Sequence, residues 1–249
     1  MKTKVSTLLA LAAAFYTPLA LAQTGNTTNA PVIAAPTNLV VECICCGVAR
    51  VTVTATVADI DGDALTAVWY VNGTPYRTND IPAGSPTTTA ALSIAARLPL
   101  GTNEVMISVS DGITAPVDWI TQVIVQDTTP PDIRRLVANP KVLWPPNHKM
   151  VLVRLHADVV DCTRVTNRIV RITSDEPVDD KGDGKFAPDW VICGKMSAYL
   201  RAERSGRGDG RTYTITVEST DALGNSSTAR TRVYVPHDMR KKQANPRDF

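Results

Sequence analysis

The sequence predicts an all-β protein that consists of two consecutive Ig-like antiparallel β-sandwiches joined by a proline-rich linker. Short segments such as Val51–Val57 alternate apolar and hydroxyl residues with a period of two, which is the pattern of a strand with one buried face. Turns rich in Asp, Gly and Asn, such as Asp61-Gly62-Asp63, separate these segments. The same order of strands and turns recurs after about 100 residues, so we expect two similar modules.

The linker begins at Asp127 and runs through a segment that holds five of the 17 prolines. We interpret it as a joint whose hinge residues are Asp127, Pro130, Pro131 and Trp144, with Trp144 packed under the edge of the second sandwich. The expected organisation is a signal peptide at 1–22, a flexible leader at 23–36, a first sandwich at 37–127, a second sandwich at 128–236 that contains the Trp-Pro-Pro-Asn-His-Lys segment, and a polar tail at 237–249.

The first 22 residues have the features of a secretory signal. Lys2 and Lys4 precede the apolar run Leu8–Leu21, and Ala20-Leu21-Ala22 forms a small-x-small cleavage site. The apolar run is shorter than the roughly 20 residues that a membrane span needs. We therefore expect an exported protein, secreted or at the cell surface, with no transmembrane segment after cleavage of the signal.

Seven short strands per module are typical of an Ig-like sandwich. The expected strands of the first module are 38–43, 51–57, 65–71, 89–98, 104–110 and 118–126. Those of the second module are 150–157, 168–173, 196–203, 213–219 and 229–235. No segment of the mature chain has the periodicity of an amphipathic helix.

Charge is distributed unequally between the two halves. Residues 23–127 carry three Arg against nine Asp and Glu, whereas residues 128–249 carry 21 Lys and Arg against 15 acids. This difference is compatible with two ordinary solvated surfaces, and also with head-to-tail self-association. The basic residues are interleaved with acids and lack an aromatic platform, which argues against nucleic acid as a partner.

Several motifs carry a resemblance to known families. The first module, with Asp59-Ile-Asp-Gly-Asp63 followed by Leu65 and Trp69, resembles the polycystic-kidney-disease (PKD) and cadherin-like sandwiches of bacterial surface proteins. The second resembles the Ig-like repeats related to the hyaline-repeat group. Its matching segments are Asp127–Pro131, Leu143–Lys149, Asp175–Pro177, Gly182–Gly184, Asp189-Trp190, Leu200–Ser205 and Asp221–Asn225. The resemblance implies a stalk or adhesive spacer and no reaction.

Five cysteines in an exported protein should be mostly oxidised. Cys162 and Cys193 are the only pair in the second module, so we predict a disulfide between them. Cys43, Cys45 and Cys46 cannot all pair within their own module, and one of them is therefore expected to remain a free thiol or to join another chain. A metal–thiolate or redox site is the alternative for this group.

Two acidic segments and the linker are candidate cation sites. Asp59, Asp61 and Asp63, with Asp111 expected nearby, offer the oxygen ligands around a glycine that suit calcium. The same residues also suit an ordinary turn, and the sequence leaves both interpretations open. The acidic stretch 175–189 is interpreted as a solvated hairpin with an ion site as the alternative, and Asp127 could share an ion with Asp132.

Motifs that would indicate catalysis are absent from the sequence: it contains no Gly-x-Ser-x-Gly elbow, no His-Glu-x-x-His and no glycine-rich phosphate loop. We therefore expect a structural or adhesive module that is not an enzyme, stiffened by Ca²⁺ and otherwise without cofactors. Its partner would be a surface protein or polysaccharide, or a second copy. The alternative function is a carbohydrate- or polymer-binding accessory module that uses Trp119 and Trp190.

Overall fold

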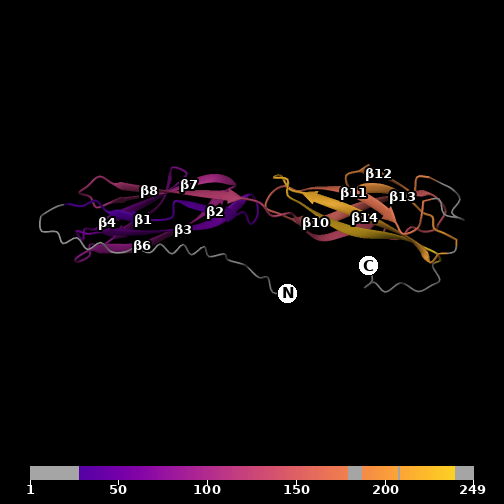
Figure 1. Ribbon diagram of the computed structural model, residues 1–249, viewed down its shortest axis with the longest axis horizontal. Coiled ribbons are helices and arrows are strands. Elements are labelled where there is room, and N and C mark those ends of the chain that lie inside the picture. Colours follow the sequence, from indigo (N-terminus) through magenta and orange to yellow (C-terminus); the bar gives the residue numbers. More distant parts are fainter. Residues whose placement is uncertain (1–27, 179–186, 207, 239–249) are drawn as a thin grey trace. The chain divides into compact units, whose positions relative to one another are not determined.

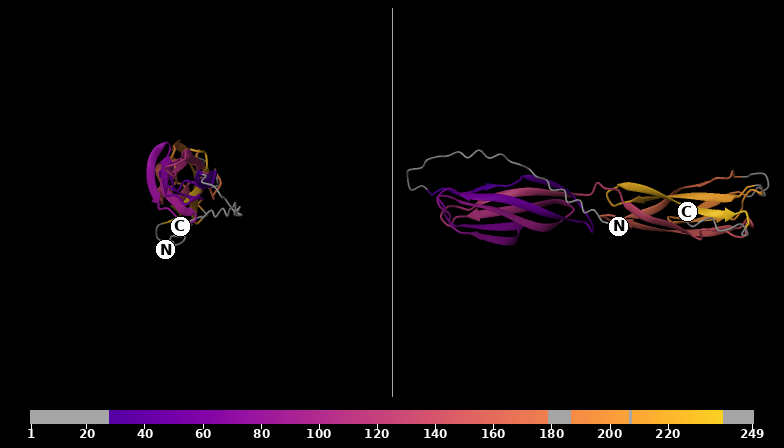
Figure 2. Two further views of the ribbon diagram at one scale, coloured as in Figure 1. Left: turned by 90° about the vertical axis from the view of Figure 1, so that its left-hand side faces the viewer. Right: turned by 90° about the horizontal axis from the view of Figure 1, so that it is seen from below.

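The computed structural model describes residues 28–178, 187–206 and 208–238. The expected signal peptide and nearly all of the expected polar tail lie outside these residues. The described chain forms fifteen strands and contains no helix, so none that could span a membrane. It divides into a first unit of residues 28–43 and 48–126 and a second unit of residues 44–47 and 127–238. Figures 1 and 2 show each unit as a pair of facing sheets.

The first unit is an Ig-like sandwich of a three-stranded and a five-stranded sheet. The three-stranded sheet has the order β1 (Val32–Ala34), β3 (Val48–Asp59), β6 (Thr88–Pro99). The five-stranded sheet has the order β2 (Asn38–Glu42), β8 (Val117–Gln126), β7 (Gly101–Ser110), β4 (Leu65–Val71), β5 (Thr74–Ile81). Strand β2 pairs with β8 in parallel, and the other pairs are antiparallel. In Ig terms the sheets are A-B-E and A′-G-F-C-C′.

The core of the first unit follows the period-two pattern of its longest strands. On β3, Val51, Val53 and Val57 are at most 4% exposed while the threonines between them face solvent. Trp69 on β4 and Leu98 on β6 are at most 1% exposed. Because one face of each sheet is apolar, the two sheets bury it against each other.

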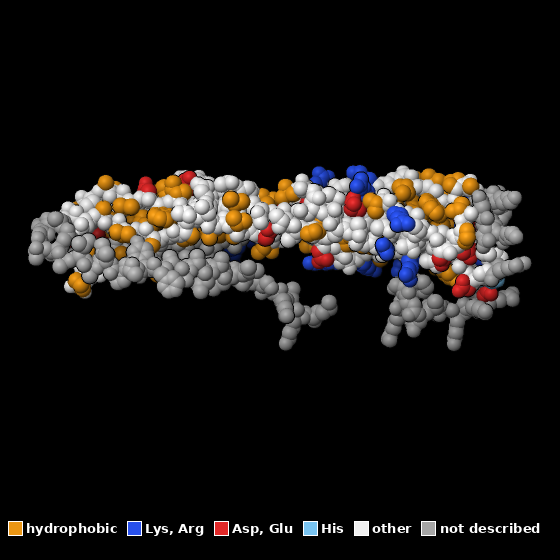
Figure 3. Space-filling model, in the orientation of Figure 1, with side chains coloured by type: hydrophobic (Ala, Val, Ile, Leu, Met, Phe, Trp, Pro, Cys, Tyr) orange, Lys and Arg blue, Asp and Glu red, His pale blue; other side chains and the backbone are white. Residues whose placement is uncertain are grey.

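The second unit has the strand order of a constant-type Ig domain. One sheet has the order β12 (Trp190–Gly194), β13 (Ser197–Arg201), β10 (Met150–Val160), β9 (Asp132–Asn139), and the other has the order β11 (Thr166–Ser174), β14 (Gly210–Thr220), β15 (Ser226–Pro236). With β9 as strand A, these are the D-E-B-A and C-F-G sheets of that class. The Lys and Arg side chains visible in Figure 3 gather mainly over this unit.

Tyr213 and Leu143 anchor the second core. Tyr213 on β14 is fully buried and its hydroxyl donates to the Arg201 carbonyl at 2.9 Å, as the tyrosine at the start of strand F does in Ig domains. Trp190 meets the Tyr213 ring edge-on with centroids 6.2 Å apart. Leu143 is 1% exposed, whereas Trp144 is 46% exposed. The expectation that Trp144 packs under the sandwich edge is therefore wrong, because the chain turns Leu143 into the core instead.

Four strands lie outside the segments predicted from the sequence: β1, β5, β9 and β12. Strand β1 has three residues and falls in the expected flexible leader. Strand β5 is exposed over most of its length and β12 over four of its five residues. Edge strands of this kind bury little, so they lack the alternation by which strands are recognised.

Candidate metal sites and a buried ionic network

The first acidic cluster lies in the turn after β3. Asp59, Asp61 and Asp63 each bring a carboxylate oxygen within 4.8 Å of the others. Asp59 is 1% exposed, and its Oδ1 accepts the Asp61 and Asp63 backbone N–H groups at 2.9 and 3.2 Å. Its Oδ2 is buried without a hydrogen-bond partner. The turn therefore holds one fixed carboxylate oxygen that faces no donor.

Glycine is required in the middle of this turn. Gly62 has a φ of +79°, and a Cβ there would come within 2.7 Å of the Gly84 carbonyl oxygen. The Gly84 N–H in turn donates to the Gly62 carbonyl at 3.0 Å. The close approach of these two backbones fixes Asp61 and Asp63 on either side of the glycine.

Asp111 is near this cluster but does not join it. Its Oδ1 accepts the Ile113 and Thr114 N–H groups at 2.8 and 2.7 Å, and its Oδ2 accepts the Thr114 hydroxyl at 2.8 Å. Desolvation raises the pKa of Asp111, but these hydrogen bonds outweigh it and hold the pKa below its ordinary value. The oxygens that lie within 4.8 Å of one another belong to Asp59, Asp61 and Asp63, so the structure does not bring Asp111 into the group that the sequence predicted with Asp59.

The carboxylates at this end of the first unit nevertheless repel one another. Desolvation, followed by the negative charges of Asp59, Asp61 and Asp111, raises the pKa of Asp63. Asn29 donates its N–H to Asp61 Oδ2 at 2.6 Å and its Nδ2 group to Asp61 Oδ1 at 3.1 Å. Within the described residues, no Lys, Arg or His pairs with Asp59, Asp61 or Asp63.

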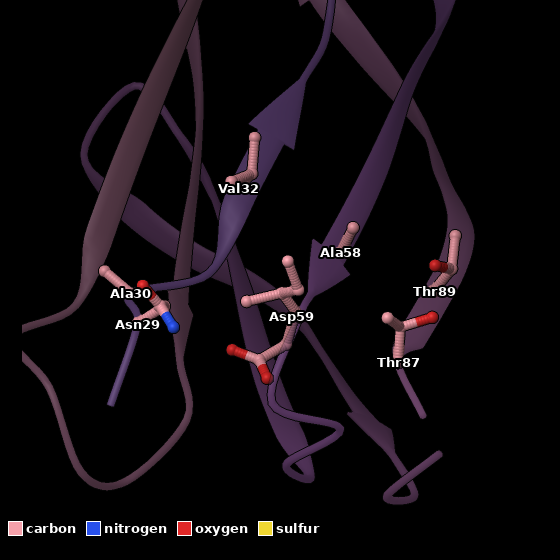
Figure 4. Close-up of a pocket in the computed structure, with 8 residues that line it drawn as sticks. Asn29, Ala30, Val32, Ala58, Asp59, Thr87 and Thr89 are labelled. Carbon is pink, nitrogen blue, oxygen red and sulfur yellow. The ribbon is translucent and has the colours of Figure 1, made fainter. Parts of the chain in front are cut away.

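Asp59 also lines a shallow pocket of about 430 Å³. Figure 4 shows its carboxylate between the segment that carries Asn29 and the strand that carries Thr89. The residues around the pocket are Asn29, Ala30, Val32, Ala58, Asp59, Ile60, Thr87 and Thr89. Half of these residues are alanines or threonines, and Asp59 is the only ionisable one among them.

A second acidic cluster lies in the second unit, and the sequence singled out only one of its members, Asp127. Asp132, the expected partner of Asp127, is not in this cluster; its Oδ2 accepts Arg134 Nε at 3.4 Å. Asp127, Asp161 and Asp221 bring carboxylate oxygens within 4.8 Å of one another. Asp127 precedes β9, Asp161 follows β10 and Asp221 follows β14. The local signal that these turns share is Asp-x-Thr, which occurs at Asp127 and at Asp161. It is too short to find a site without the pairing of the strands.

The disulfide expected between Cys162 and Cys193 is not formed. Cys193 is a free, exposed thiol, whereas Cys162 and Cys43 are disulfide-bonded. The residue after Cys193 pairs with Ser197, which pairs with Arg154 on β10, eight positions before Cys162. At about 3.3 Å per residue this separates the two cysteines by roughly 26 Å, whereas a disulfide needs Cα atoms within about 7 Å.

The three clustered cysteines of the first module also differ in their states. Because Cys43 is disulfide-bonded, it is not the free or intermolecular thiol that the sequence allowed. Cys45 and Cys46 carry exposed thiols, and Cys46 has a φ of 60°. The Gly47 N–H donates to the Cys162 carbonyl at 2.9 Å, within the second unit.

At the other end of the second unit, Arg211 is fully buried among carboxylates. Its Nη1 donates to Asp189 Oδ2 at 2.6 Å and lies 3.3 Å from Glu203 Oε1. Its Nε donates to Glu176 Oε2 at 3.1 Å, and its Nη2 to the Pro177 carbonyl at 3.1 Å. In the acidic stretch 175–189, Glu176 and Asp189 are therefore bound to a buried guanidinium, whereas Asp175 is exposed. Residues 179–186 of the expected hairpin lie outside the described residues.

His148 from the Trp-Pro-Pro-Asn-His-Lys segment closes the same network. It has a φ of 62°, and its Nδ1 lies 3.2 Å from Glu203 Oε2. Its N–H donates to the Ala202 carbonyl, and its carbonyl accepts the Arg201 guanidinium at 2.9 Å. The Trp-Pro-Pro-Asn-His-Lys motif by itself gives no sign of this contact with Glu203, which lies 55 residues further along the chain.

The buried charges alter the titration of this network. Desolvation and then the neighbouring Asp189 raise the pKa of Glu203, although the His148 and Arg211 contacts oppose this. Burial lowers the pKa of Arg211, but the Tyr213 hydroxyl, Glu176 and Asp189 outweigh it and raise the pKa above its ordinary value. Burial raises the pKa of Tyr213 to about 12. The guanidinium thus stays charged and neutralises the acids around it.

No protein-family model matches this chain, and no curated protein matches it. Among solved structures it is similar to a CARDB domain from Pyrococcus furiosus in complex with di-metal ions, with 15% identity over 42% of this chain and 100% of that one and a TM-score of 0.30. It is also similar to SGBP-B from the Bacteroides ovatus mixed-linkage glucan utilization locus, in complex with a mixed-linkage heptasaccharide, with 17% identity over 83% and 47% and a TM-score of 0.27. A third is the Ig1-2 module of the Drosophila receptor protein tyrosine phosphatase DLAR, with 16% identity over 83% and 98% and a TM-score of 0.26.

The strand order of each unit is that of an Ig-like domain, so the chain is a tandem of Ig-like β-sandwiches. The finer resemblance to PKD and hyaline-repeat modules stays a prediction.

Proposed function

We propose that this chain is a non-catalytic structural or adhesive module of a secreted or cell-surface protein, and that Ca²⁺ stiffens its first sandwich through Asp59, Asp61 and Asp63. The observation that carries the proposal is the Oδ2 of Asp59, which is buried without a donor in a group of three carboxylates. A buried carboxylate without a partner is costly, and a bound cation would remove that cost.

Calcium fits the chemistry of the cluster. Ca²⁺ binds carboxylate and carbonyl oxygens at about 2.3–2.6 Å, so two of its ligands stand at most about 5 Å apart. The oxygens of the cluster lie within 4.8 Å of one another, and the raised pKa of Asp63 reflects, after desolvation, the repulsion of its neighbours. A cation would neutralise this repulsion and tie the turn after β3 into one rigid unit.

An extracellular location is supported by the cysteine chemistry. The structure contains disulfide-bonded Cys43 and Cys162, and disulfides persist in oxidising compartments. The predicted signal peptide supports the same location. As an adhesive module the chain would bind a surface protein or a polysaccharide, or a second copy through the opposite formal charges of its halves.

The alternative, a carbohydrate-binding accessory module, has less support. Trp190 packs edge-on against Tyr213 and against the second core. Trp119 is half-buried and its Nε1 donates to the Pro36 carbonyl at 3.3 Å. Both tryptophans expected to stack on a sugar are thus engaged within their own sandwich.

The test is thermal unfolding of the mature, oxidised protein in EDTA and in millimolar Ca²⁺, with the Asp59→Asn variant beside the wild type. The asparagine Oδ1 can still accept the Asp61 and Asp63 N–H groups, so the turn is preserved while the charge is lost. We expect Ca²⁺ to raise the melting temperature of the first sandwich in the wild type and not in the variant. Asp118→Asn, an exposed acid on β8, is the matched control and should keep the shift. A wild-type shift that persists in Asp59→Asn would refute the proposed site.

A further inference from the structure

We infer that Asp127, Asp161 and Asp221 form a second divalent-cation site, which the second sandwich holds independently of the first. Three turns bring these residues together. Val160 pairs with Asp132, so the lead-in to β9 and the turn after β10 meet at one end of their sheet. The hairpin that contains Asp221 joins β14 to β15 at the Thr220–Ser226 pair, and the Ser227 hydroxyl donates to the Pro131 carbonyl.

Each turn commits part of its carboxylate to local hydrogen bonds. Asp127 Oδ1 accepts the Thr129 hydroxyl at 3.0 Å, and Asp161 Oδ1 accepts the Thr163 hydroxyl at 3.1 Å and its N–H at 2.8 Å. These bonds fix the direction of two carboxylates and leave their Oδ2 atoms for another ligand. Fixed ligands of this kind are what a preorganised metal site requires.

Asp127 supplies the independent sign of a ligand. It is 4% exposed, and its Oδ2 is buried without a hydrogen-bond partner. Buried polar atoms almost always have a partner, and an orphan of this kind calls for an unseen ion or water. Since Asp161 and Asp221 bring only further carboxylate oxygens to the same place, a cation fits this orphan better than a water molecule.

The described chain supplies no cation of its own at this cluster. No Lys, Arg or His within the described residues pairs with any of the three carboxylates. The Asp221 carboxylate accepts N–H groups of Leu223 and Asn225 on Oδ1 and the Asn225 amide on Oδ2. An all-oxygen, anionic site of this spacing suits Ca²⁺.

Asn225 positions two of the ligands. Its Nδ2 donates to Asp221 Oδ2 at 2.7 Å and to the Asp127 carbonyl at 3.0 Å, and its N–H donates to Asp221 Oδ1 at 2.8 Å. One amide thus holds the hairpin after β14 against the lead-in to β9. We assign Asn225 as a positioning residue of the site.

The two sandwiches place their acids at equivalent points of the Ig fold. Asp59 ends β3 and Asp161 follows β10, and these are the B strands of their units. Asp111 and Asp221 follow the F strands β7 and β14. Both F–G acids accept hydrogen bonds within their own turns, but only Asp221 lies within 4.8 Å of the other carboxylate oxygens of its cluster. The second site therefore draws on three separate turns, and the first on one.

The test is equilibrium dialysis of the mature, oxidised protein against Ca²⁺, with the number of bound ions counted for the wild type and for Asp127→Asn and Asp161→Asn. Either variant keeps the Thr hydrogen bond through the asparagine Oδ1 and removes one charged ligand. We expect each variant to lose one bound ion or to weaken one site at least tenfold, while Asp59→Asn retains that site. Asp158→Asn, an exposed acid on β10, should bind as the wild type does.

Unchanged stoichiometry and affinity in both Asp127→Asn and Asp161→Asn would overturn the inference. Loss of the same ion in Asp59→Asn would overturn the independence of the two sites. Far-UV circular dichroism of each variant in EDTA checks that the sandwich is folded, and the half-buried Asp161 provides the test if Asp127→Asn does not fold.

Discussion

The second sandwich has a cluster of carboxylates at each of its two ends, and the two clusters differ in whether a basic side chain neutralises them. At one end Glu176, Asp189 and Glu203 surround the guanidinium of Arg211, which is fully buried. At the other end Asp127, Asp161 and Asp221 meet without a basic side chain from the described part of the chain. The carboxylates around Arg211 have a cation from the chain itself, whereas the Asp127 cluster would take its cation from solution.

The difference determines what each cluster can do. An internal guanidinium is permanently charged, so the network around it is fixed when the chain folds. A site that depends on a free ion responds to the concentration of that ion, because binding to the folded state adds RT ln(1 + [L]/Kd) to its stability. The Arg211 end is therefore structural, and the Asp127 end is where the environment of the protein can act.

The largest effect should follow from removal of Arg211. Arg211→Met leaves Asp189 buried without its cation and removes the closer guanidinium from Glu203, whose Oε2 still lies 3.8 Å from Arg201 Nε. Loss of one partner from a buried ion pair costs about 3–5 kcal/mol. We expect urea unfolding to show a loss of that size in the second sandwich. Arg211→Lys keeps the charge but not the forked geometry, so it should fall between the wild type and Arg211→Met. A loss below about 1 kcal/mol in Arg211→Met would contradict the structural role.

Removal of one charge at the Asp127 end should not destabilise the protein when Ca²⁺ is absent. Without Ca²⁺, Asp127→Asn relieves repulsion among three carboxylates, so we expect the variant to be at least as stable as the wild type. With Ca²⁺ at 100 times its Kd, the wild type should gain about 2.7 kcal/mol and the variant much less. Thermal unfolding of both proteins in EDTA and in Ca²⁺ measures whether the order of their stabilities changes between the two conditions. Equal calcium gains in the two proteins would show that the cluster is only a set of turns.

A smaller difference should separate Glu203→Gln from the wild type as pH rises. The folded protein holds the pKa of Glu203 above the ordinary glutamate pKa of 4.5. Between that value and the raised pKa, the folded state therefore binds the proton more tightly than the unfolded state. The Glu203 contribution to stability is therefore present at low pH and lost as pH rises through the raised pKa. The free energy of unfolding, measured from pH 4 to 8, should fall less steeply in Glu203→Gln. If the free energy of unfolding fell equally steeply with pH in both proteins, titration of Glu203 would not be the cause.

The smallest effect should come from an exposed pair. Arg168 NH2 lies 2.7 Å from Glu218 Oε1 across β11 and β14, but the Arg168 side chain is 63% exposed. Exposed ion pairs contribute about 0.2–1 kcal/mol, so Arg168→Ala should cost no more than that. A cost as large as that of Arg211→Met would mean that burial is not what distinguishes the two arginines.

The sequence predicted the features that depend on local pattern. The alternation of Val51, Val53 and Val57 located β3, and the adjacent Asp59, Asp61 and Asp63 identified the first cluster. The edge strands β5 and β12 were not predicted, because little of either strand is buried and neither therefore has one apolar face.

The features that depend on tertiary pairing could not be predicted. Asp127 and Asp221 are far apart in the sequence and meet only through the register of β9, β10 and β14. The partners of Arg211 likewise come from separate segments. Three of the segments that carried the resemblance contain His148, Asp189 and Glu203, and these residues belong to the network around that buried arginine. Two others contain Asp127 and Asp221, which meet in the opposite cluster.

Hydrogen exchange of the mature, oxidised protein in EDTA and in Ca²⁺, resolved by peptide mass spectrometry, tests the contrast between the two ends most directly. The account predicts that Ca²⁺ slows exchange in the turns that carry Asp127, Asp161 and Asp221 and leaves the segment from Glu203 to Tyr213 unchanged. Exchange that is unaffected in those three turns, or slowed equally at both ends, would contradict it.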